Sequence, residues 1–145
     1  MRSWAFGATP EVTTPMVPSD AARAAVPVIQ TAVKTIRVAH KGDYADLSTA
    51  TQVATLPWGE LTSFSGARYP GVGSKSFVLH IEDVPTDDCM TFVRAVAPGF
   101  RDVWIGAKDP QETGATVFGS AHLDLAMLSR ACHGRPTVGI DFIAH

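Results

Sequence analysis

The stretch that decides the fold is KSFVLHIEDVPTDDCMTFVRA, residues 75–95, because its hydrophobic period changes at a proline near its middle. Apolar residues fill every second position from Phe77 to Ile81, which predicts a half-buried strand over 76–82. His80 lies on the alternate, polar face and is expected to be exposed rather than to bind a metal. One face of the resulting sheet should therefore cover the core.

The second half of the same stretch carries the signals of a helix over 86–97. Thr86 or Asp87 can accept hydrogen bonds from free amides in the first turn, and Asp88 also suits the positive end of the helix dipole. The Pro98-Gly99 pair then stops the helix. We interpret the two aspartates as a helix start rather than as paired catalytic acids, because adjacent helical residues point in different directions.

Upstream of this stretch, a longer helix is predicted over 19–39. Apolar residues recur there at three- and four-residue steps, and Ser19 or Asp20 can cap the first turn. Pro27 has no amide donor, so it either kinks this helix or marks the start of its regular part. The helix has one apolar stripe, which needs a core to bury it.

Two segments separate the long helix from the strand. Residues 43–58 are expected to form one short second helix, because Gly42 ends the first helix and Pro57 stops the next one. Residues 61–76 are rich in glycine, serine and proline, so a loop or an irregular hairpin is expected there.

The C-terminal third predicts further strands. Two short strands are expected at 102–106 and 115–119, joined by a long turn. Ser120 can cap a short helix over 121–132, and residues 137–145 alternate as a half-buried last strand. The expected class is therefore α+β: an N-terminal helix packed on an antiparallel sheet of four or five strands, with small helices interposed.

Composition limits the kind of protein this can be. The 145 residues suit one domain, and 46% hydrophobic residues, 18% charged residues and a net charge of −2 favour neither disorder nor a polyanion-binding surface. Nucleic acid is therefore not an expected partner. Residues 1–18 carry three prolines and no periodicity, so they are expected to be a tail or a remnant of expression, followed by one globular domain over 19–145.

GARYPGVGS, which precedes the strand, looks at first like a phosphate-binding loop. Three residues separate Gly71 from Lys75, however, and a strand follows where a helix is needed. Ser63 and Ser65 do not satisfy the hydrolase motif Gly-x-Ser-x-Gly, and the histidines have no metal-binding spacing. We therefore predict no catalytic residue, no cofactor, no metal site and no enzymatic activity, and we expect this segment to be a surface loop.

Cys89 and Cys132 are the two cysteines of the chain, so one internal pairing exists. Pairing would close a loop of about 44 residues and stabilise the fold by about 4 kcal/mol in the chain-entropy model. Two buried thiols in a cytosolic protein are the alternative, and the spacing by itself does not decide between them.

The order of these features resembles the globular domain of type IVb pilins. A leading helix is followed by a strand, by VPTDDCMTFVRAV with a cysteine entering a helix, by a hairpin, and by ACHGRPTVGIDFIAH with a second cysteine before the last strand. GDYADLS to LPW is similar to the second short helix of that family. The resemblance covers residues 19–145, and it implies a disulfide between Cys89 and Cys132 that pins the C-terminal region.

The resemblance also implies a function. Family members are structural subunits of bacterial type IVb pili, which polymerise with other copies through a pilus assembly machinery and serve attachment, aggregation or conjugation. Their location is the extracellular filament, reached through the inner membrane and periplasm, where a host or cell-surface receptor is a further partner. The leader and apolar segment of the family do not occur before Ser19. Membrane contact is therefore implied only through a missing N-terminal helix, and the chain as it stands is expected to be soluble.

Three other functions are carried as alternatives. A minor pilin or a secretion-system pseudopilin would share the same layout, so sequence does not separate these from the major subunit. A periplasmic or extracellular binding module could use TSFSGARYPGVGS, residues 62–74, to hold a ligand or a glycan. A small hydrolase is the weakest reading, because neither a triad nor a ligand cluster is visible.

Overall fold

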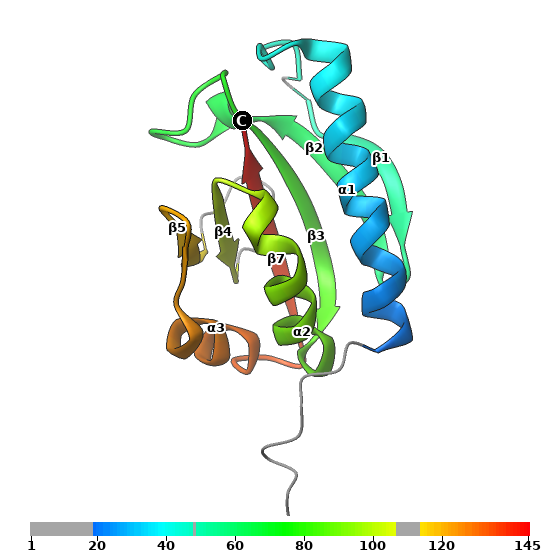
Figure 1. The fold of residues 1–145 in the computed structure, drawn as a ribbon, viewed down its shortest axis with the longest axis vertical. Helices are drawn as coiled ribbons and strands as arrows, with labels where there is room; N and C mark the ends of the chain where they lie inside the picture. The colour runs from blue at the N-terminus through cyan, green and yellow to red at the C-terminus, as the bar shows by residue number, and fades with distance from the viewer. Residues whose placement is uncertain (1–18, 48, 107–113) are drawn as a thin grey trace, which may run out of the picture.

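The computed structural model describes residues 19–47, 49–106 and 114–145, so the expected tail at 1–18 and most of the turn after 106 lie outside it (Figure 1). The described elements run in chain order as α1 Asp20–His40, β1 Thr51–Leu56, β2 Gly59–Ser65, the short 3-10 helix η2 Gly66–Arg68, β3 Phe77–Pro85, α2 Thr86–Val96, the short 3-10 helix η3 Ala97–Gly99, β4 Asp102–Ile105, β5 Ala115–Gly119, β6 His122–Leu123, α3 Leu125–Cys132 and β7 Thr137–Ala144.

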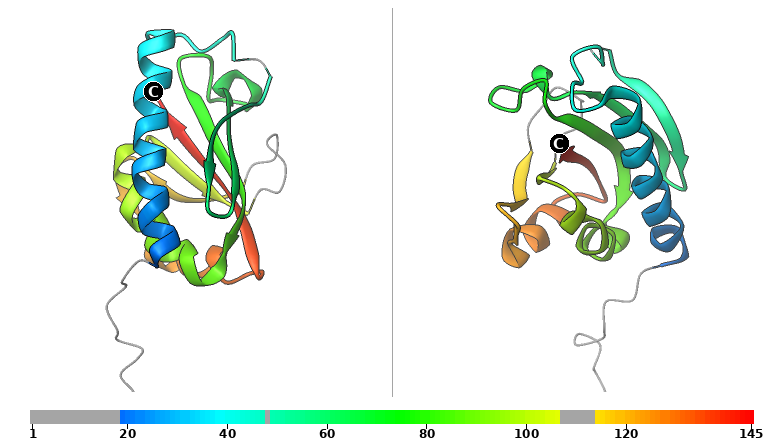
Figure 2. Two further views of the ribbon diagram at one scale, coloured as in Figure 1. Left: turned by 90° about the vertical axis from the view of Figure 1, so that its right-hand side faces the viewer. Right: turned by 45° about the horizontal axis from the view of Figure 1, so that its top comes forward.

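The sheet of the described chain is antiparallel and has the order β1-β2-β3-β7-β4-β5-β6. Helices α1 and α2 pack side by side on one face, and α3 lies beside β5 and the start of α2 (Figure 1; Figure 2). The expected α+β class, with a leading helix on an antiparallel sheet, is therefore confirmed. The sheet has seven strands rather than four or five, because β1, β2 and β6 add to those that were expected.

Helix α1 begins where the cap residues predicted. Ser19 Oγ accepts a hydrogen bond of 3.1 Å from the amide of Ala22. The helix then continues without a break past Pro27, so the idea that its regular part starts at this proline is wrong. Buried side chains on both sides of Pro27, from Ala22 to Ile36, hold the helix against the sheet and offset the missing amide donor.

A second short helix was expected over 43–58, but the described residues of this range, 43–47 and 49–58, form no helix. Its C-terminal half is strand β1, and β2 covers residues 61–65 of the segment that was expected to be a loop or an irregular hairpin. The TQVATL sequence is rich in β-branched residues, and the turn after it is anchored by Trp58. The Trp58 ring packs against Phe92 at 4.9 Å, and its Nε1 donates a hydrogen bond of 3.2 Å to Asp88.

Strands β3 and β7 are buried on both faces, although each was expected to be half-buried. One face meets α1 and α2 in the main core, where Phe142 packs edge-on to Phe92 at 5.7 Å. The other face carries a second cluster, in which Phe64 and Ile143 flank Val78 in the strand register. The expected split into one core face and one solvent face is therefore wrong for the middle of the sheet.

Helix α2 begins at Thr86 as expected, but the capping contacts of both smaller helices differ from those predicted. The residue before α2 is Pro85, and Thr86 Oγ1 instead donates to the carbonyls of Cys132 and Arg135, at 3.0 Å for the first. Helix α3 begins later than expected, because Asp124 accepts the capping hydrogen bond from the Met127 amide.

Ser120 does not cap α3. It lies with Ala121 in the tight turn between β5 and β6, where both residues have positive φ angles of 52° and 61°. The two strands predicted at 102–106 and 115–119 do form and pair with each other as β4 and β5. Their connection falls largely on residues outside the described ranges.

Gly66 has no room for a side chain. A Cβ atom there would lie 2.5 Å from the Gly73 carbonyl oxygen and 2.8 Å from the Ser76 carbonyl oxygen. We expect Gly66→Ala to lower the free energy of unfolding in urea by about 1–3 kcal/mol, since the backbone must move. Gly99→Ala is the matched control, because nothing lies within 4 Å of its Cβ position. Equal stability of the two variants would contradict this packing.

Candidate functional site

The main buried polar cluster joins His80, Asp141 and Tyr69. The Nδ1 atom of His80 lies 2.5 Å from Asp141 Oδ1, and the Tyr69 hydroxyl donates a hydrogen bond of 2.8 Å to Asp141 Oδ2. His80 is 2% exposed and Asp141 0%, so the expectation that His80 faces solvent is wrong. Tyr69 covers this face of the sheet from the loop after η2, and its ring packs against Trp104 at 5.1 Å.

Burial raises the pKa of the Asp141 carboxyl above its ordinary value of 3.8, while the hydrogen bond and charge of His80 and the hydroxyl of Tyr69 act in the opposite direction. His80 Nε2 is buried and has no hydrogen-bond partner among the described residues. An acid and a base in contact are typical of catalytic sites, but neither of these is accessible to a substrate in solution. We interpret the cluster as structural.

The serine motif does not complete a catalytic group. In the β2–β3 register Thr62 lies opposite His80, and Ser63 lies opposite Leu79. Successive residues of a strand point to opposite faces, so Ser63 and His80 are on different sides of the sheet. Ser65 caps η2 by accepting a hydrogen bond of 3.1 Å from the Ala67 amide. A serine–histidine pair of the hydrolase kind is therefore absent at these residues.

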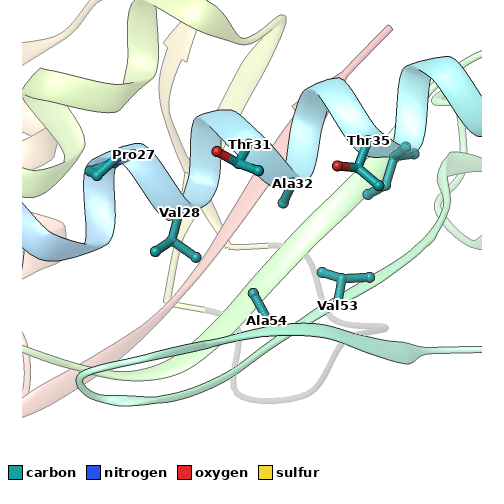
Figure 3. Close-up of a pocket in the computed structure, with 8 residues that line it drawn as sticks. Pro27, Val28, Thr31, Ala32, Thr35, Val53 and Ala54 are labelled. Carbon is teal, nitrogen blue, oxygen red and sulfur yellow. The ribbon is translucent and has the colours of Figure 1, made fainter.

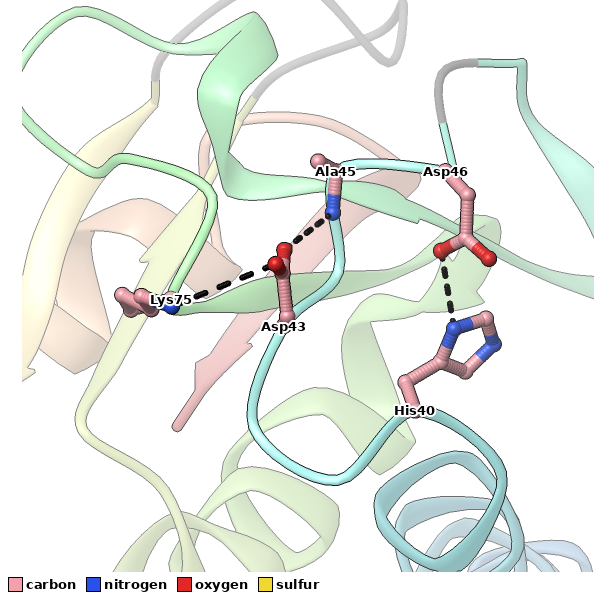
Figure 4. Close-up of polar contacts among 5 residues, drawn as sticks. All are labelled: His40, Asp43, Ala45, Asp46 and Lys75. Atoms are coloured by element: carbon pink, nitrogen blue, oxygen red, sulfur yellow. Dashed lines mark hydrogen bonds and ion pairs between the residues drawn. The ribbon is translucent and has the colours of Figure 1, made fainter.

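A second polar cluster lies at the C-terminal end of α1 (Figure 4). His40 Nδ1 is 2.9 Å from Asp46 Oδ1, and the Ala45 amide donates a hydrogen bond of 3.1 Å to Asp43 Oδ1. Lys75 Nζ approaches the same Asp43 side chain at 4.0 Å. These contacts tie the chain after α1 to the loop before β3. The described residues hold no group of three or more potential metal ligands, so this cluster lacks a metal-binding set.

A groove of about 440 Å³ runs between α1 and β1, and we call it the edge groove (Figure 3). Its helix side is formed by Pro27, Val28, Thr31 and Thr35, and its strand side by Val53 and Ala54. All of these side chains are uncharged, and the lining is mainly apolar. A groove with this lining suits an apolar protein surface better than a polar small molecule.

A second groove, of about 410 Å³, lies between α1 and the end of α2. Its floor includes Val33 and Phe100, and its rim carries Lys34 and Arg37. The Nε of Arg37 donates a hydrogen bond of 2.9 Å to the carbonyl oxygen of His145. This contact holds His145 against α1, and the charged rim distinguishes the second groove from the uncharged edge groove.

Cys89 and Cys132 are joined by a disulfide with a Cα–Cα distance of 5.6 Å. Both residues are fully buried. The bond connects the first turn of α2 to the last turn of α3. It is the pairing that the sequence resemblance implied, and it encloses β4, β5, β6 and α3 in one covalent loop.

The candidate ligand loop GARYPGVGS is less open than expected. Tyr69 is buried in its middle, and the Gly66 amide donates a hydrogen bond of 2.8 Å to the Ser76 carbonyl across its base. Ala67, Pro70, Gly71 and Gly73 are its exposed residues. Among the helices of the described ranges, none has the length and apolarity needed to cross a membrane.

The edge groove and the buried cluster were not predicted from the sequence. The TQVATL segment has no charged residue, which is a sign of an exposed uncharged strand. Gly42 and Pro57, which flank the wider segment, favoured the prediction of a short helix instead. The burial of His80 was not predicted, because alternation of apolar and polar residues in its strand indicates one buried face and one face in solvent. Tyr69 covers this face of the sheet, and it lies in a segment without hydrophobic periodicity, so the sequence pattern does not predict the contact.

The described chain thus combines a long amphipathic helix, an antiparallel sheet with β7 in its centre and one disulfide, and this architecture matches the fold of a type IV pilin. Among solved structures, the type IV pilin TcpA from Vibrio cholerae El Tor biotype is similar: the match covers 86% of this chain and 96% of that chain, with 15% sequence identity and a TM-score of 0.57. No protein-family model matches the chain, and no curated protein matches it by sequence. The similarity establishes the fold.

Proposed function

We propose that this protein is a structural subunit of a bacterial type IVb pilus, in which copies of the chain polymerise into an extracellular filament. The observation that carries the proposal is the similarity to the type IV pilin TcpA, which extends over 86% of this chain. The partners are other subunits and the pilus assembly machinery, and the filament serves attachment, aggregation or conjugation through a host or cell-surface receptor.

The surface of the domain supports a structural role over a catalytic one. The polar cluster of His80 and Asp141 is closed to solvent, whereas the edge groove is open and uncharged. Helix α1 buries one stripe against the sheet and leaves the other side exposed, with Val38 75% exposed. That exposed side also carries Gln30, Lys34 and Arg37, so the apolar lining of the edge groove is the feature that favours contact with another protein.

Filaments sheared from cells that make this protein provide the test. We expect the chain to be their main component by mass spectrometry, with Cys89 linked to Cys132, and we expect gold-labelled antibodies to decorate their full length. Deletion of the gene should abolish them. Filaments that persist without the chain, or a chain that occurs only as a periplasmic monomer, would contradict the proposal. A few copies per filament would instead indicate a minor pilin.

A further inference from the structure

We draw no further inference here: the strongest candidate, the uncharged edge groove between α1 and β1, is an unpartnered surface, and nothing in the described part of the chain shows what covers it.

Discussion

Reduction of the Cys89–Cys132 disulfide is expected to lower the free energy of unfolding by about 4 kcal/mol, because the bond removes loop-closure entropy from the unfolded chain. The two cysteines are 43 residues apart in sequence, so the closed loop is long. Urea unfolding with and without a reducing agent measures the difference. For a domain of ordinary stability this is a large fraction of the total.

The double variant Cys89→Ser with Cys132→Ser is the control for this experiment. It should be as unstable as the reduced protein and insensitive to the reducing agent. Non-reducing mass spectrometry of the protein should find the two cysteines linked. Two free thiols in that sample would show that the bond does not form. An unfolding curve that does not shift on reduction would show that the bond does not stabilise the fold.

Asp141→Ala is expected to lower the free energy of unfolding by about 3–5 kcal/mol, since it removes one member of a buried, hydrogen-bonded acid–base pair. His80 Nδ1 would lose its partner inside the sheet, and the Tyr69 hydroxyl would lose the carboxylate at 2.8 Å. Tyr69→Phe removes only that second hydrogen bond, and we expect about 1–2 kcal/mol. A larger loss of unfolding free energy for Tyr69→Phe than for Asp141→Ala, measured by urea unfolding, would contradict this assignment.

The same carboxyl predicts a pH dependence of unusual sign. Burial raises the pKa of Asp141 in the folded state above 3.8, so the folded protein holds this proton more tightly than the unfolded chain does. The resulting stability is complete below about 3.8 and is lost as pH rises through the raised pKa. The stability of wild type relative to Asp141→Asn should therefore fall with rising pH. A difference in unfolding free energy between wild type and Asp141→Asn that does not change with pH would contradict this prediction.

The sequence predicted those elements whose local pattern and tertiary environment agree. The change from strand to helix at Pro85 has alternation before it and an acidic first turn after it, and β3 and α2 form there. β1 was missed because Gly42 and Pro57 were interpreted as the ends of a short helix, and β2 because the glycine, serine and proline of residues 61–76 favoured a loop or an irregular hairpin. Their strand form is decided by pairing with β3 and by Trp58 packing on Phe92.

The candidate surfaces were harder to predict than the fold. The edge groove lies between α1 and β1. The residues of β1 were expected to belong to a second helix that is separate from α1, so no groove between them was predicted. The buried state of His80 depends on Tyr69, which lies eleven positions earlier in an irregular loop. Neither feature leaves a periodic signal, because each arises from contacts between segments rather than within them.

The central position of β7 has a consequence for how the domain is made. β7 is the last element of the chain, yet it lies between β3 and β4 and pairs with both. The β1–β3 half and the β4–β6 half share no strand pairing without it. The sheet therefore closes only after residues 137–144 have been synthesised and have left the ribosome. Loss of these eight residues would leave two sheet fragments instead of one domain.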